Sequence, residues 1–126
     1  MRKGVLLIGA GGHARSCIDV IESAGLRVFG LIDRDPTMVG GDVLGYPVLG
    51  SDCELLKLAK DSSGALITVG QIGRPKIRVS LYEKLTSCGV VPLSVSASTA
   101  RVSRHASVGH GSIVMHQALV NAGACV

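Results

Sequence analysis

Short, mainly apolar runs recur through the first two thirds of the chain. They lie at residues 5–8, 28–32, 65–69 and 90–93, and none contains a charged residue. A strand that is covered on both faces of a sheet has no polar side to show, so such runs are typical of parallel strands in α/β proteins. The pattern therefore predicts four strands of a small parallel sheet.

Between these runs the apolar residues recur at steps of three and four, which is the spacing of an amphipathic helix. The segments at 15–25, 52–60 and 74–87 fit this spacing. Ser51 followed by Glu54 is a capping-box pattern that marks the start of the second helix. The buried side of the first helix is expected to carry Ala14, Cys17, Ile18, Ile21 and Ala24. Alternation of strands and helices predicts right-handed β-α-β units.

After about residue 95 the pattern changes to a period of six. Valine recurs at 102, 108, 114, 120 and 126, and a small residue stands two positions before each valine. A hexapeptide repeat with an inward valine and a small residue at each corner predicts a left-handed parallel β-helix. An ordinary pair of strands would explain neither the six-residue spacing of the valines nor that of the small residues.

The two patterns divide the chain into residues 1–95, a Rossmann-like α/β domain, and residues 96–126, the first coils of a β-helix. With about three hexads to a coil, fewer than two coils are present, and solenoids need several stacked coils and a cap. We expect the sequence to be part of a longer protein, with a tail completed by neighbouring copies as the alternative.

Composition narrows the classes of function. Of the 126 residues 47% are hydrophobic but only 2% are aromatic, and the net charge of +4 comes from scattered basic residues. A surface for nucleic acid is not expected, because aromatic side chains that stack on bases are almost absent. The four cysteines show neither C-x-x-C pairs nor metal-finger spacing, so we expect free thiols and no metal site. Free thiols are typical of a reducing compartment, and we therefore expect a cytoplasmic protein. No segment is long enough to span a membrane.

The chemistry is expected at the ends of three strands. Gly9-Ala10-Gly11-Gly12-His13-Ala14 links the first strand to the first helix, Asp33 follows the second strand, and Gly70 follows the third. A glycine-rich turn before a helix directs free N–H groups at phosphate. Ligands bind outside the carboxyl ends of parallel strands, so these ends should meet at one site.

Two kinds of phosphate ligand fit this turn. Gly9-x-Gly11-x-x-Ala14, with Asp33 about 20 residues on, matches the dinucleotide fingerprint and leaves an NAD(P)-type domain open. About four strands are fewer than the six-stranded dinucleotide fold needs. The other kind is a phosphate-bearing ligand of a different class, which the resemblance described next implies.

The whole chain resembles the sialic-acid O-acetyltransferase family of sugar acetyltransferases. Within that family it is similar to the N-acetyltransferases that act on UDP-linked 4-amino-sugars. The likeness rests on an ordered set of segments followed by the hexads, namely residues 8–14, 31–33, 45–50 and 67–73, with Arg78, Leu81 and Tyr82. It implies acetyl transfer from acetyl-CoA, as co-substrate, to an amino or hydroxyl group of a UDP-linked sugar in surface-glycan biosynthesis.

The resemblance also implies which residues hold the sugar nucleotide. They are Gly11, Gly12, His13, Asp33, Arg34 and Gly70. The backbone N–H groups of Gly11 and Gly12 suit a pyrophosphate, and His13 suits a phosphate oxygen or a sugar hydroxyl. Asp33 suits donors on the ribose or the uracil rather than phosphate.

By the same resemblance the enzyme is a homotrimer that holds acetyl-CoA on the β-helix between subunits, where a histidine acts as general base. That histidine is expected beyond Val126, so no catalytic residue is assigned within this chain. His105, His110 and His116 lie off the inward positions, and of these only His116 is conceivable as a base. A non-catalytic module remains the third hypothesis.

Overall fold

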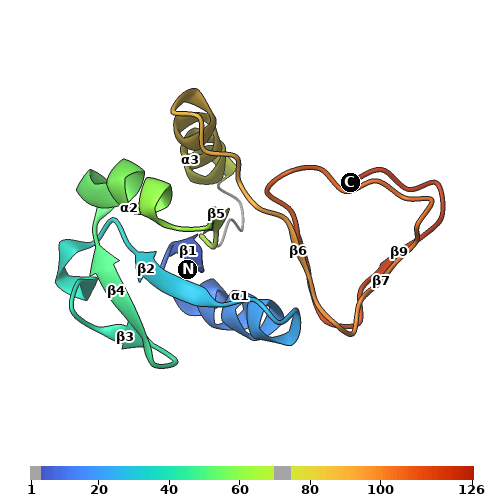
Figure 1. The fold of residues 1–126 in the computed structure, drawn as a ribbon, viewed down its shortest axis with the longest axis horizontal. Helices are drawn as coiled ribbons and strands as arrows, with labels where there is room; N and C mark the ends of the chain where they lie inside the picture. Colours follow the sequence, from blue (N-terminus) through green and yellow to red (C-terminus); the bar gives the residue numbers. More distant parts are fainter. Residues whose placement is uncertain (1–3, 70–74) are drawn as a thin grey trace.

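A computed structural model describes residues 4–69 and 75–126. Figure 1 shows two bodies side by side, a layered α/β domain and a triangular coil. The first contains a sheet with the strand order β3-β4-β2-β1-β5. Its strands are β1 (Val5–Ile8), β2 (Val28–Ile32), β3 (Asp42–Val43), β4 (Tyr46–Gly50) and β5 (Gly64–Ile67).

The central strands β4, β2, β1 and β5 are parallel, and β3 adds an antiparallel edge that the sequence pattern did not predict. The chain moves from β1 to β2 on one side and later returns to place β5 on the other side of β1. The strand order therefore reverses beside β1, and ligands of open α/β sheets bind at such a point.

Helices cover both faces of this sheet, in agreement with the mainly apolar runs. Val5 and Leu7 of β1 pack with α1 (Gly12–Ser23) on one face. Leu6 and Ile8 pack on the other face with α2 (Leu55–Asp61) and α3 (Pro75–Ser87). Two short 3-10 turns, η1 (Pro36–Met38) and η2 (Asp52–Glu54), complete the domain.

The structure corrects two predicted boundaries. Helix α1 begins at Gly12 rather than Arg15 and ends at Ser23, so Ala24 is exposed while Val20 joins the buried face. The expected strand at 90–93 is reduced to a single parallel bridge between Ala65 and Pro92. Proline lacks the N–H that a longer ladder needs, and only the next residue, Leu93, donates to Ala65 O at 2.7 Å.

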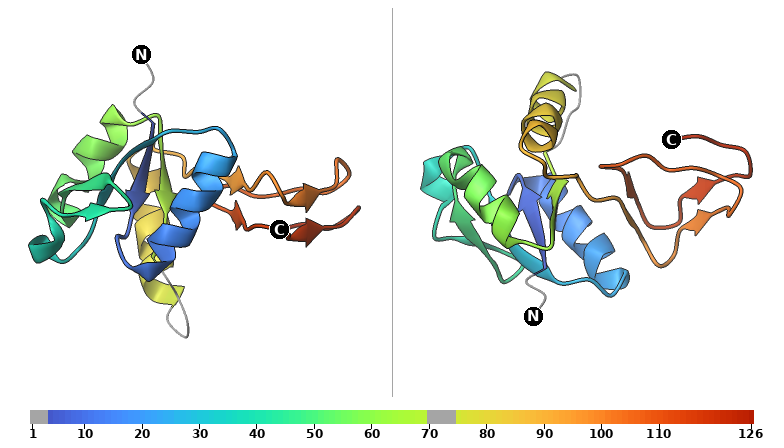
Figure 2. Two further views of the ribbon diagram at one scale, coloured as in Figure 1. Left: turned by 90° about the horizontal axis from the view of Figure 1, so that it is seen from below. Right: turned by 45° about the horizontal axis from the view of Figure 1, so that its top comes forward.

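The tail forms the predicted parallel β-helix. Its short strands are β6 (Val95–Ser96), β7 (Arg101–Val102), β8 (Ile113–Val114) and β9 (Leu119–Val120). Pairing of β6 with β8 and of β7 with β9 joins residues 18 apart, such as Ser96 with Val114 and Val102 with Val120, which is three hexads for each coil. Figure 2 shows the successive turns of the coil stacked edge-on.

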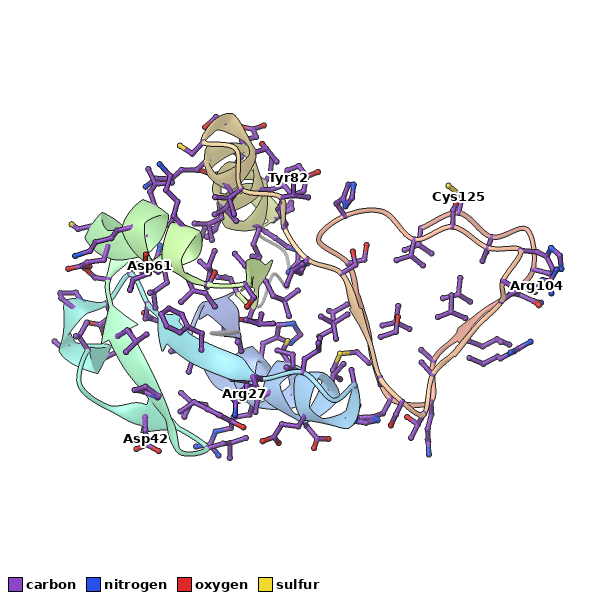
Figure 3. All side chains as sticks on the ribbon, viewed as in Figure 1. Arg27, Asp42, Asp61, Tyr82, Arg104 and Cys125 are labelled. Atoms are coloured by element: carbon purple, nitrogen blue, oxygen red, sulfur yellow. The ribbon has the colours of Figure 1, made fainter. Side chains whose placement is uncertain are left out.

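One edge of the triangular coil lies against α1. Outward residues on this edge are apolar, and Val95 and Ala97 are buried in the same core as α1, with Ile113 and Met115 packed beside them. On other edges outward residues are exposed, as Figure 3 shows for Cys125. The valines at 114 and 120 are buried, as the repeat predicts, whereas Val126 is 61% exposed.

Candidate functional site

The carboxyl ends of four strands open into a cavity of about 400 Å³. Its walls come from the ends of β1, β2 and β5, from the start of η2 after β4, and from one side of α3. The lining residues are Ile8, Gly9, Gly11, Gly12, His13, Ile32, Asp33, Arg34, Asp52, Thr68, Val69, Ile77 and Leu81. Five of the six predicted site residues are thus brought together, and the sixth, Gly70, lies outside the described residues.

The amino end of α1 forms the floor of this cavity. Gly11 is the residue that precedes the helix, and among the described residues no side chain caps it. The first N–H groups of an uncapped helix carry a partial positive charge and remain available to an anion. A Cβ placed on Gly11 or Gly12 would meet no described atom within 4 Å, so both positions border open space.

Gly9 has a different role from the two glycines that follow it. Its φ of +124° is one that residues with side chains rarely adopt, and an added Cβ would lie 2.9 Å from Val69 Cγ2. The turn is further held by the Thr68 hydroxyl, which donates to Gly9 O at 2.7 Å. Gly9 and the buried Thr68 therefore shape the turn, and Gly11 and Gly12 face the cavity.

Asp33 connects two loops at the cavity wall. Its Oδ2 accepts from the backbone N–H of Ala10 at 3.0 Å, and its Oδ1 accepts from the backbone N–H of Asp35 at 2.9 Å. Each oxygen keeps one further lone pair for a ligand. The carboxylate thus positions the glycine turn and also borders the cavity, next to the exposed Arg34 and the half-buried His13.

Five further lining residues, outside β1, β2 and the glycine turn, were not predicted as site residues from the sequence. Asp52 follows β4, and its only signal was its place just after a short extended segment and Ser51. Thr68 and Val69 directly follow β5, where the sequence predicted only Gly70 as a site residue. Ile77 and Leu81 belong to α3, whose apolar stripe predicted burial and not a cavity wall.

The histidines of the tail do not enter this cavity. Nε2 of His116 lies 3.0 Å from Asp19 Oδ2 on α1, and its Nδ1 lies 2.7 Å from the Thr99 hydroxyl. His116 therefore contributes to the contact between the coil and α1, while His105 and His110 are exposed. Within residues 4–69 and 75–126 no group of three His, Cys, Asp or Glu side chains is placed to hold a metal ion.

A larger cavity of about 610 Å³ lies at the opposite edge of the sheet, bordered by Gly4, Leu26, Arg27, Leu93 and Ser94 among others. Among the described residues that line it Arg27 is the only charged one, and no described helix begins at this cavity. A specific ligand site needs a few converging polar groups as well as volume. The smaller cavity at the switch point meets this condition better.

Comparison with known proteins identifies the family. Residues 4–85 match the family described as the PglD N-terminal domain. The chain belongs to the PglD N-terminal domain family. The resemblance seen in the sequence is thereby confirmed for this part of the chain. None of the described helices of this family member is long and apolar enough to cross a membrane.

Solved structures of sugar N-acetyltransferases share the fold over nearly the whole chain. Perosamine N-acetyltransferase from Caulobacter crescentus, a histidine-to-asparagine mutant in complex with CoA and GDP-perosamine, is 31% identical, with a TM-score of 0.86 over 98% of this chain. The acetyltransferase domain of PglB from Neisseria gonorrhoeae, in complex with acetyl coenzyme A, is 28% identical, with a TM-score of 0.83 over 99% of this chain. The PglD-like chain is thus homologous to acetyl-CoA-dependent sugar N-acetyltransferases.

A curated relative of a different kind also matches. The redox-sensing transcriptional repressor Rex of Streptomyces coelicolor is 34% identical over 98 residues, which are 75% of this chain and 36% of the repressor. The chain spans 56% of the perosamine N-acetyltransferase and 58% of the PglB domain. Each of these relatives is therefore considerably longer than the chain described here.

Proposed function

We propose that the cavity at the end of β1 binds a nucleotide-linked amino sugar. In this proposal the sugar is the acceptor of an acetyl group from acetyl-CoA, in the biosynthesis of a surface glycan. The observation that carries the proposal is the uncapped amino end of α1, where Gly11 and Gly12 leave open space in a cavity at the switch point. The homology to sugar N-acetyltransferases supports the choice of ligand.

Each predicted residue has a role in this proposal. The backbone N–H groups of Gly11 and Gly12 hold the pyrophosphate, as helix N-termini do in nucleotide sites. His13 and Arg34 supply further donors to phosphate or sugar oxygens. Asp33 accepts from the ribose with the lone pairs that Ala10 and Asp35 leave free. Gly70 keeps its predicted contact, although it is not among the described residues.

Substitution of Gly12 by alanine separates binding from folding. Alanine is the better helix former by about 1 kcal/mol, and its Cβ meets no described atom, so the melting temperature should stay equal or rise. The methyl group would occupy space reserved for phosphate, and we expect binding of a sugar nucleotide to weaken by roughly 10-fold, about one hydrogen bond to a charged group. Isothermal titration calorimetry is the suitable measurement, because the chain has no tryptophan whose fluorescence could report binding. Unchanged affinity for UDP- and GDP-linked sugars would contradict the proposed phosphate site.

The second candidate function is binding of an NAD-type dinucleotide. The similarity to the repressor Rex and the glycine fingerprint favour it. The same calorimetric titration decides, with NAD⁺ and NADH measured beside the two sugar nucleotides. Preference for a dinucleotide would replace the acetyltransferase proposal with a dinucleotide-binding module.

Acetyl transfer itself is assigned to no residue of this chain. His116, the one tail histidine considered as a base, has its Nε2 against Asp19. We therefore predict that the chain binds the sugar nucleotide but releases thiol from acetyl-CoA at no more than the uncatalysed rate. A colorimetric thiol assay with a 4-amino-sugar nucleotide checks this. Rapid release that disappears in His116→Ala would return His116 to the role of base.

The nucleotide, the acceptor atom and the assembly are further expectations. The sequence resemblance favoured a UDP-linked sugar, whereas the perosamine enzyme was solved with a GDP-linked one. The name of the perosamine N-acetyltransferase favours an amino group as the acceptor. A homotrimer and a cytoplasmic location remain predictions.

A further inference from the structure

The cavity contains two carboxylates in different states. Both oxygens of Asp33 already accept backbone N–H groups. Asp52 also lines the cavity, but within the described residues its side chain makes no hydrogen bond. The adjacent turn does not need it, because Ser51 and Glu54 form the capping box there. Asp52 is thus an acceptor at the cavity rim that the fold leaves unused.

The strand order places the possible contacts in a row. Neighbouring parallel strands are about 4.8 Å apart, and the order β4-β2-β1 sets Asp52, Asp33 and the amino end of α1 one strand apart along the cavity. A nucleoside diphosphate has the same sequence of parts, with base, ribose and phosphates at comparable steps. With phosphate at α1 and ribose at Asp33, the base lies at Asp52.

A nucleotide bound in the opposite direction, with its base on the β5 side of α1, fits the cavity less well. On the β5 side the cavity wall consists of Val69, Ile77 and Leu81, and the hydroxyl of Thr68 already donates to Gly9 O. Among the described residues this wall carries no carboxylate, and its one acceptor side chain is the hydroxyl of Thr68. A negative carboxylate is also best tolerated far from the phosphates, which again assigns Asp52 to the nucleoside end.

The chemistry of the bases then distinguishes among nucleotides. Guanine presents two adjacent donors, N1–H and the N2 amino group, which match the two oxygens of a carboxylate. Uracil presents a single N3–H between two carbonyl oxygens, which a carboxylate repels, and adenine and cytosine present a ring acceptor at this edge. We propose that Asp52 determines the nucleotide specificity of this cavity and selects a guanine nucleotide by accepting from N1–H and N2–H.

This inference rests on the proposed function, because it presumes phosphate at α1. The test is calorimetric titration with GDP, inosine diphosphate and UDP, since inosine lacks only the N2 amino group. We expect GDP to bind roughly 10-fold or more tightly than the other two, the value of a hydrogen bond to a charged acceptor. In Asp52→Asn the preference for GDP over inosine diphosphate should fall to nearly one.

Asp61→Asn is the matched control. Asp61 ends α2, is exposed and does not line the cavity, so this variant should bind all three nucleotides like the parent. Melting curves of both variants report folding separately. An equal loss of affinity for all three nucleotides in Asp52→Asn overturns the inference, as does a parent protein that does not distinguish GDP from inosine diphosphate.

The two proposals fail in different ways. A parent chain that binds UDP or GDP but is unaffected by Asp52→Asn retains the nucleotide-sugar function and loses only the role of Asp52. A parent chain that binds neither nucleotide nor their sugar conjugates overturns both proposals together.

Discussion

At the scale of single residues, position in the fold separates side chains of the same type. Gly9 is required by its backbone, whereas Gly11 and Gly12 border the cavity. Asp33 is engaged by two backbone N–H groups, whereas Asp52 has no partner among the described residues. Cys17 is fully buried in α1, whereas Cys53 and Cys125 are exposed. Residue type alone therefore does not predict availability to a ligand or a reagent.

Cys17 gives a residue-scale prediction. Burial raises the pKa of its thiol from 9.0 to about 11, and the nearby Arg78 offsets only part of that effect. In the native protein at pH 8 we expect iodoacetamide to modify Cys53 and Cys125 rapidly and Cys17 only after unfolding, because the thiolate is the reactive form. Mass spectrometry of peptides over time measures this. In urea all four cysteines should react alike.

The same pKa shift has a consequence for stability. The native state favours the neutral thiol, so the contribution of Cys17 is complete below pH 9.0 and is lost as the pH rises through about 11. Alkaline unfolding should therefore be accompanied by labelling of Cys17. Rapid labelling of Cys17 at pH 8 in the folded protein would show that the core around α1 opens readily.

At the scale of elements, α1 is the helix that makes the site. It begins directly after the glycine turn, three residues earlier than its apolar spacing indicated, so that Gly12 and His13 lie in its first turn. This early start brings the helix end to the carboxyl end of β1. The apolar side of the same helix carries Cys17, Ile18 and Ile21 and supports both the sheet and the β-helix.

The two edges of the sheet differ from what the sequence predicted. The segment at 90–93 has the composition of a strand, but Pro92 restricts it to one bridge with Ala65. The short β3 contains no apolar run that would predict a strand, and it forms because Asp42 and Val43 pair with β4. The apolar runs of β1, β2 and β5 were predicted well, and the edges of the sheet were not.

At the scale of the whole molecule, several polar contacts join the α/β domain to the β-helix, and two of them involve charged side chains. Asp19 on α1 meets His116, as described above. Arg78 on α3 donates from Nη1 to Ile67 O at 3.1 Å and from Nη2 to Gly111 O at 3.2 Å. One guanidinium thus links the end of β5 with a corner of the coil. Beside it Ile77 and Leu81 of the same helix line the cavity.

Arg78 therefore gives a prediction at this scale. Arg78→Ala removes two donors from partly buried carbonyl groups, and we expect a loss of about 1–3 kcal/mol in the free energy of unfolding. Amide hydrogen exchange near Gly111 should accelerate more than exchange in β1. Lys76→Ala, an exposed position on the same helix, is the control and should change neither quantity. Equal acceleration in both regions would argue against a local link between the two bodies.

The sequence by itself determined those features that repeat locally. Apolar runs, helical spacing and the six-residue period depend on near neighbours in the chain, and they predicted both bodies and the buried Val114 and Val120. The glycine turn and Asp33 were also recognisable, because strand ends in a parallel sheet meet at one edge.

Only the tertiary structure decided which side chains share the cavity and which remain free within the described residues. Asp33 accepts from Ala10, 23 residues away, and the contact of His116 with Asp19 joins opposite parts of the chain. Such contacts depend on strand order and on how α3 and the coil pack, and no local pattern encodes these distances. The free acceptor at Asp52 became visible for this reason only after folding placed β4 beside β2.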